Sequence, residues 1–217
     1  LDCLRQSSVQ EGEAGGITQS IGASVVNLKD GSKITFIDTP GHAAFSKMRS
    51  RGSKLADIAL LILDSSDGVK PQTKEAIDHI NEAKIPFIVV ATKTDLPAAS
   101  VDVALTSLEK LGIFFEGRGG QTPFVGVSAK KKEGLTELLD LICLFSEVNN
   151  IQSDNDCPLE AVVIETTREK GGNMVSVVVR NGKLTIGQQI YTDVTKGKIK
   201  GLFDDKNKPV REVNPGE

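Results

Sequence analysis

The sequence contains no tryptophan, one tyrosine and only three cysteines among 217 residues. The cysteines are odd in number and far apart, which argues against a disulfide framework or a metal site and for reduced thiols. The longest apolar run, residues 58–63, is bounded by Asp57 and Asp64 and falls well short of the roughly 20 residues that cross a bilayer. We therefore expect a cytoplasmic protein without a membrane span.

Positive charge is not in excess, because 26 Lys and Arg residues face 29 Asp and Glu residues and the formal net charge is -3. This balance gives no bulk attraction to nucleic acid, so DNA binding is not expected and any RNA contact must be local. The first residue is Leu1 rather than Met, and no basic segment with an apolar core follows it. We expect the sequence to be an interior piece of a longer protein.

Apolar patterning divides the chain into two parts. From residue 23 to residue 146, short β-branched runs alternate with amphipathic stretches of helical length, which predicts an α/β fold with a mostly parallel sheet and helices on both faces. The first two strands should form an antiparallel hairpin, because Asp30-Gly31 between them suits positive φ. The predicted strands are 23–28, 33–38, 58–64, 87–92 and 124–128, and the predicted helices are 45–51, 72–83, 101–111 and 134–145.

The second part begins after a polar segment rich in Asn and Asp that ends at Pro158. Beyond it the apolar residues recur with a period of two, separated by Gly, Lys and Asn, which predicts a small antiparallel β-barrel. We predict a first domain over residues 1–147, a linker over 148–157 and a partial barrel over 158–217.

The most specific local motif is FIDTPGH, residues 36–42. An apolar strand brings Asp38 to its carboxyl end, where a metal-holding carboxylate belongs in a phosphate site. Thr39, Pro40 and Gly41 then turn the chain tightly enough to bring a backbone N–H against a ligand. Taken alone, the same residues also fit a strand that simply ends in a proline turn.

A second motif, TKTD, follows another predicted strand and comprises Thr92, Lys93, Thr94 and Asp95. A carboxylate can accept two parallel hydrogen bonds from the N–H and exocyclic amino group of guanine, whereas adenine presents a different edge. The aliphatic stem of Lys93 could lie along the plane of the base. Alone, however, this tetrapeptide is more often an ordinary surface turn.

A third turn, in VGVSAK, places Ser128, Ala129 and Lys130 after the last strand, where their backbone N–H groups could meet the guanine carbonyl. This triplet is uninformative by itself. Its position is informative, because all three turns follow strands of one predicted parallel sheet, and ligands bind at the carboxyl ends of such strands. Together the three turns predict a guanine-nucleotide site.

Three longer segments accompany these motifs: EAGGITQSIGA at 13–23, IDTPGHAAFSKMRSRG at 37–52, which extends the first motif, and DGVKPQTKEAI at 67–77. Over essentially its whole length the chain resembles translational GTPases, and within them the bacterial initiation factor two branch. The resemblance implies a P-loop GTPase-type domain followed by the first part of a β-barrel. It also implies a factor that promotes initiator-tRNA binding and ribosomal subunit joining and hydrolyses GTP on the ribosome.

The resemblance also assigns roles to residues. Thr18 would bind Mg²⁺ and sense the γ-phosphate, Asp38 would reach the same ion through water, Gly41 would give its N–H to the γ-phosphate, and His42 would orient or polarise the attacking water as the catalytic residue. The cofactors implied are GTP or GDP with Mg²⁺, held by Thr18 and Asp38. The implied nucleotide-binding residues are Thr18, Asp38, Thr39, Pro40, Gly41, His42, Thr92, Lys93, Thr94, Asp95, Ser128, Ala129 and Lys130.

The sequence departs from the family pattern in three respects. No Gly-x-x-x-x-Gly-Lys-Ser/Thr phosphate loop occurs, and the strand that precedes it in the family, between 33–38 and 58–64 in the sheet, is missing, so this piece alone should bind GTP weakly if at all. Thr92 stands where the family usually has Asn. The module that binds initiator tRNA is absent, so contact with that tRNA would use other regions, while the ribosome, both subunits and their RNA, remains the implied partner.

Two alternatives stay open at this point. The chain could belong to another translational GTPase of the elongation-factor type, which differs in what it delivers. It could instead be a non-hydrolysing module that docks on ribosomal RNA through its barrel while its nucleotide site has decayed.

Overall fold

The three-dimensional structure is a computed structural model that describes residues 1–5, 21–40, 55–169 and 172–217. The predicted helix 45–51 and the candidate residues Thr18, Gly41 and His42 lie outside these ranges. The chain forms two compact units. The first comprises Leu1–Gln19 and Thr39–Ile151, and the second comprises Ser20–Asp38 and Gln152–Glu217.

A three-stranded parallel sheet forms the centre of the first unit. Its strands β3 (Ala59–Asp64), β4 (Phe87–Thr92) and β5 (Phe124–Gly126) lie in the order β3-β4-β5. The register places Asp64 beside Thr92, so the carboxyl ends of β3 and β4 meet at one edge. Strand β5 is shorter than predicted because the chain turns away after Gly126, and Ser128 pairs instead with Glu133.

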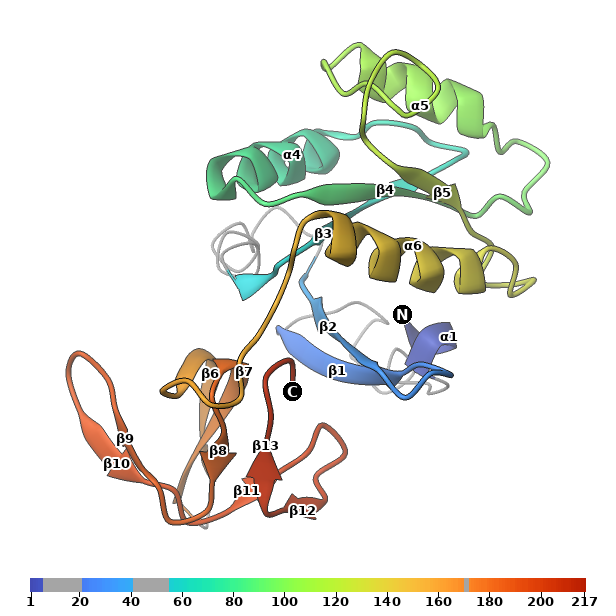
Figure 1. Cartoon of the computed structure of the whole chain (residues 1–217). Coiled ribbons are helices and arrows are strands. Elements are labelled where there is room, and N and C mark those ends of the chain that lie inside the picture. Colours follow the sequence, from blue (N-terminus) through green and yellow to red (C-terminus); the bar gives the residue numbers. More distant parts are fainter. Residues whose placement is uncertain (6–20, 41–54, 170–171) are drawn as a thin grey trace. The chain divides into compact units, whose positions relative to one another are not determined.

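Helices cover both faces of this sheet, as predicted. Helices α4 (Pro71–Ala83) and α5 (Val101–Glu109) share one face, and α6 (Leu135–Val148) lies on the other (Figure 1). The short helix α1 (Asp2–Arg5) precedes them in the chain. In the described part of the chain, no helix is long and apolar enough to span a membrane. The core between the sheet, α4 and α5 contains Leu61, Leu63, Ile77, Ile80, Val89, Ala104, Leu105, Leu108, Ile113 and Phe115.

The predicted hairpin is present as β1 (Gly22–Asn27) and β2 (Lys33–Asp38), paired antiparallel. Gly31, with φ 87°, supplies the left-handed conformation that the turn requires. The hairpin belongs to the second unit, where Val25 N donates to Asp205 Oδ2 at 3.0 Å. This grouping depends on contacts across the whole chain, which local sequence patterns do not reveal.

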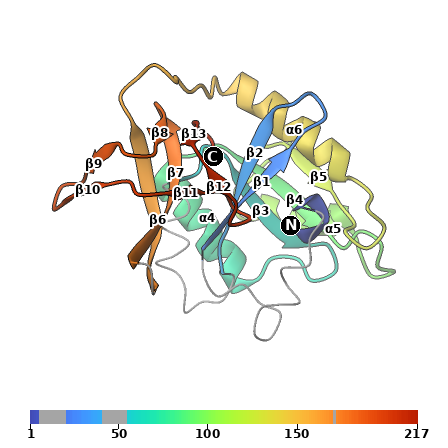
Figure 2. The ribbon, with the colours of Figure 1, turned by 90° about the horizontal axis from the view of Figure 1, so that it is seen from below.

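The remainder of the second unit is antiparallel, which agrees with the expected partial barrel (Figure 2). The long strands β6 (Glu160–Glu169) and β7 (Gly172–Asn181) form a hairpin, and Ile164, Val178 and Val179 are buried. The short strands pair as β8 with β13, β9 with β10 and β11 with β12. Their bounds are β8 Leu184–Thr185, β9 Gln189–Tyr191, β10 Lys196–Lys198, β11 Leu202–Phe203, β12 Pro209–Val210 and β13 Glu212–Val213.

Candidate functional site

The turn after β4 carries the second predicted motif. Strand β4 is almost completely buried, and its end is marked by Lys93, whose φ of 58° is left-handed. The turn is closed by a hydrogen bond from Leu96 N to Lys93 O at 3.1 Å. A buried strand that ends in so sharp a turn brings Lys93 and Asp95 to the edge of the sheet, where a ligand can be reached.

The loop after β5 meets this turn through Ser128. Its side chain is fully buried, and its Oγ donates a hydrogen bond of 2.6 Å to Asp95 Oδ1. The same Oγ accepts from Lys131 N at 3.1 Å, while the backbone of Ser128 exchanges two hydrogen bonds with Glu133. Ala129, next in the chain, is exposed at the start of the loop. The structure therefore brings together two predicted site residues, Asp95 and Ser128, from different turns.

The same hydrogen bond affects the pKa of Asp95. The Ser128 hydroxyl is the main cause that lowers this pKa below its ordinary value of 3.8, against the opposing effect of burial and with help from Lys130 and Lys131. The carboxylate therefore stays ionised at neutral pH. Since an ionised carboxylate has about four acceptor positions, one bond from Ser128 leaves it able to accept further donors.

Lys93 forms an ion pair that the sequence patterns did not predict. Its Nζ lies 2.7 Å from Oδ2 of Asp64, at the end of β3. The other oxygen of Asp64 accepts hydrogen bonds from the backbone N and the Oγ of Ser66, at 2.9 and 2.6 Å. The pair lowers the pKa of Asp64 well below its usual range and raises the pKa of Lys93.

Thr92, the residue that departs from the family pattern, is tied into the sheet. Its Oγ1 donates to Leu63 O at 3.1 Å, and its carbonyl accepts from both Ser65 N, at 3.0 Å, and Ser65 Oγ, at 2.6 Å. These bonds join the ends of β3 and β4. The Thr92 hydroxyl thus stabilises the platform from which Lys93 and Asp95 extend.

Two glycines allow the backbone around β5 and its following loop to pack closely, and the sequence patterns predicted a role for neither. A Cβ on Gly126 would lie 3.3 Å from Cγ2 of Thr94, which is a tight fit. A Cβ on Gly134 would lie 2.1 Å from Gly126 O, and Gly134 also has a φ of +75°. Glycine at 134 is therefore required both for the backbone conformation and for the close approach that ends the Ser128 loop.

The phosphate side of the predicted site is described only in part. Asp38 ends β2 opposite Gly22, within the second unit. Pro40 is buried, and Thr39 precedes it. A carboxylate at a strand end suits Mg²⁺, which prefers oxygen ligands. Among the residues that the structure describes, no group of three or more His, Cys, Asp or Glu side chains could hold a metal ion.

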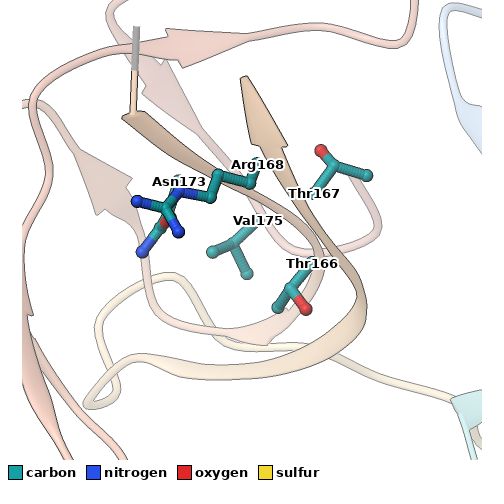
Figure 3. A pocket seen from close by; sticks show the side chains of 5 residues that line it. All are labelled: Thr166, Thr167, Arg168, Asn173 and Val175. Carbon is teal, nitrogen blue, oxygen red and sulfur yellow. The ribbon is translucent and has the colours of Figure 1, made fainter. Parts of the chain in front are cut away.

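A separate hollow of about 340 Å³ lies on the β6–β7 hairpin (Figure 3). Arg168 is paired with Asn173 and Thr166 with Val175, so these side chains share one face of the hairpin. The described lining has one guanidinium, an amide and hydroxyls, which can hydrogen-bond a ligand. Among the described residues of this lining there is no carboxylate, imidazole or thiol, and no predicted site residue.

Comparisons with known proteins identify the family of the chain. The family model of the elongation factor Tu GTP binding domain matches residues 4–147. A translation initiation factor IF-2 from Caldanaerobacter subterraneus subsp. tengcongensis is 44% identical over 216 residues, which is 99% of this chain and 30% of that protein. The chain spans less than a third of the length of the curated relatives that it matches.

Solved structures show the same architecture. A bacterial selenocysteine-specific elongation factor, EF-Sec, has a TM-score of 0.78 at 23% identity and covers 99% of this chain and 38% of its own, which supports the fold. GDP-bound aIF5B from Aeropyrum pernix has a TM-score of 0.70 at 26% identity, over 98% of this chain and 47% of its own. The chain therefore belongs to the family of the elongation factor Tu GTP binding domain, and its similarity to initiation factor IF-2 proteins extends over its whole length.

Proposed function

We propose that this chain is the nucleotide-binding part of a cytoplasmic translation initiation factor of the IF-2 kind, which binds GTP and GDP and hydrolyses GTP on the ribosome. The observation that carries the proposal is the junction of Asp95 and Ser128 at the carboxyl edge of the sheet. The family match and the 44% identity to an IF-2 protein support it.

Base recognition follows from the chemistry of this edge. The ionised carboxylate of Asp95 accepts hydrogen bonds from N1–H and the 2-amino group of guanine, which adenine cannot donate in the same arrangement. The stem of Lys93 packs along the base plane. The exposed turn formed by Ala129 and Lys130 offers backbone N–H groups to the guanine carbonyl. Recognition of the base is therefore divided between the turns after β4 and β5.

The phosphate half rests on the resemblance. Thr18 and Asp38 would hold Mg²⁺, which supplies positive charge to offset the charge of the phosphates. Gly41 would donate its N–H to the γ-phosphate. His42 would orient the attacking water, so that catalysis consists mainly of positioning and charge stabilisation. The ribosome, through both subunits and their RNA, is the partner that places His42, and initiator tRNA is bound by other regions.

The experiment compares the two histidines in the full-length protein. His42→Ala should retain GTP binding and lose ribosome-stimulated GTP hydrolysis. His79→Ala is the matched control, because His79 lies on α4, where its ring contacts Glu75 and Glu82, and takes no part in the proposed site. If His42→Ala turned over GTP on ribosomes as fast as the unmutated protein, the assignment of His42 would be wrong.

The alternatives of a non-hydrolysing module and an elongation factor remain testable. One observation favours the non-hydrolysing module. The Thr92 hydroxyl donates its proton to Leu63 O within the sheet, so that proton is not available to a nucleotide. A full-length protein that bound ribosomes but not GTP would support it. The elongation-factor alternative is weakened by the 44% identity to an IF-2 protein over 99% of this chain.

A further inference from the structure

Asp64 occupies a position that links the ends of two neighbouring strands of the sheet, β3 and β4. It is the last residue of β3, in register with Thr92, the last residue of β4. Its side chain is about four-fifths buried, with a relative exposure of 21%. Both carboxylate oxygens are engaged, because Oδ1 accepts from Ser66 and Oδ2 contacts the Lys93 ammonium at 2.7 Å. The bonds from Ser66 therefore hold the Asp64 carboxylate in place independently of its ion pair with Lys93.

Lys93 is restrained at both ends by this arrangement. Its backbone has a left-handed φ of 58° directly after β4, and its ammonium is held at the end of β3. A lysine side chain at the surface otherwise samples many rotamers, and ordering it upon binding costs free energy that reduces affinity. A carboxylate that holds the ammonium in advance removes part of this cost.

We propose that Asp64 is a positioning residue of the guanine site, which orders the Lys93 side chain across the ends of β4 and β3 so that its stem is in place when the base binds. This inference rests on the proposed function, since it requires that Lys93 contact guanine. In this proposal Asp64 acts through Lys93 and does not contact the base itself.

The neighbouring hydrogen bonds give Asp64 a rigid base. Ser65 N and Oγ both donate to the Thr92 carbonyl, and Thr92 Oγ1 donates to Leu63 O. Leu63 and Ser65, on either side of Asp64, are therefore hydrogen-bonded to Thr92, the residue before Lys93. The distance between the carboxylate and the lysine backbone is set by the sheet and is independent of any ligand.

The test measures GDP binding to the full-length protein in the presence of Mg²⁺. Asp64→Asn should weaken GDP binding by about two- to fivefold, mainly through faster dissociation, because an ion pair in which the lysine is exposed contributes modestly. Asp64→Glu should restore most of the affinity, since it retains the carboxylate. Asp78→Asn is the matched control. Asp78 is exposed on α4, so the change removes the same charge and should leave affinity unchanged.

A double-mutant cycle separates positioning from a general structural effect. In a Lys93→Ala background, the Asp64→Asn change should have no further effect on GDP affinity. The inference is overturned if Asp64→Asn binds GDP like the unmutated protein, or if it weakens binding equally in the Lys93→Ala background. If the unmutated full-length protein did not bind GDP at all, the proposed function would fail first, and this inference with it.

Discussion

The Ser128 hydroxyl donates a 2.6 Å hydrogen bond to Asp95 Oδ1 and so joins the turn after β5 to the turn after β4. The two residues are 33 positions apart in the chain, and each follows a strand of the same parallel sheet. Because Ser128 is fully buried, the bond fixes the direction of the Asp95 carboxylate without any ligand. The base-recognition group is therefore preorganised by its own fold.

Asp95→Asn should change the base preference of the site from guanine to xanthine. The amide of Asn offers one acceptor and one donor, so it cannot accept both guanine hydrogen bonds, but it matches xanthine, which has a carbonyl in place of the 2-amino group. We expect GDP affinity of the full-length protein to fall by about 100-fold, since hydrogen bonds to charged groups contribute about 1.5–3 kcal/mol each. Affinity for xanthosine diphosphate should rise.

The control for this change is Asp140→Asn, on the exposed side of α6, which removes the same charge away from the site. Competition of GDP and xanthosine diphosphate against a fluorescent nucleotide measures both affinities. An Asp95→Asn protein that kept its preference for GDP would show that Asp95 does not read the base.

Ser128→Ala should weaken guanine binding without abolishing it. The change removes the donor that directs Asp95, and a hydrogen bond to a charged group contributes about 1.5 kcal/mol or more, which corresponds to roughly tenfold in GDP affinity. Ser146→Ala serves as a control, because that hydroxyl donates within α6 to Cys143 O. Equal effects of the two substitutions would contradict a specific role for Ser128.

The same bond predicts a pH dependence of stability. The folded pKa of Asp95 is lowered below its ordinary value of 3.8, chiefly by Ser128, so the stability it contributes is present above that value and is lost as pH falls through the folded pKa. The full-length protein and its Ser128→Ala variant should therefore differ in thermal midpoint at pH 7, and the difference should shrink as the pH falls below 3.8 and through the folded pKa of Asp95. A difference that grew upon acidification would contradict this sign.

Gly134→Ala should destabilise the first unit more than a typical glycine substitution. Its φ of +75° is unfavourable for alanine, and the new Cβ would lie 2.1 Å from Gly126 O. We expect a loss of about 3 kcal/mol or more in the free energy of unfolding, since backbone strain and overpacking add. Gly112→Ala, with a φ of +85° and open space around the new Cβ, should cost only about 1–2 kcal/mol. Denaturant titrations that gave equal losses would refute the close approach at Gly134.

Sequence patterns predicted the positions of the regular elements well where apolar residues are periodic. The predicted strand at 87–92 coincides with β4, and the predicted helix at 72–83 differs from α4 by one residue. The meeting of Asp95 with Ser128 could also be expected, because ligand-binding turns gather at the carboxyl edge of a parallel sheet. The positions of buried strands and of their ends are thus the features that can be predicted most directly from the sequence.

Other features depend on contacts that are distant in sequence. The pairing of Asp64 with Lys93 requires the register of β3 against β4, and the need for Gly134 appears only when its approach to Gly126 is known. Thr92 was noted as a departure from the family, but its bond to Leu63 could not be predicted from the motif. The roles of Thr18 and His42 stay predictions from the resemblance.

The central claim is that this chain carries a guanine-specific nucleotide site. The most direct measurement is a titration of the full-length protein with fluorescent GDP and fluorescent ADP in the presence of Mg²⁺. We predict saturable GDP binding that depends on Asp95 and exceeds ADP binding by at least about 100-fold, since two charge-assisted hydrogen bonds together contribute about 3 kcal/mol or more. Absence of GDP binding, or equal affinity for GDP and ADP, would contradict it.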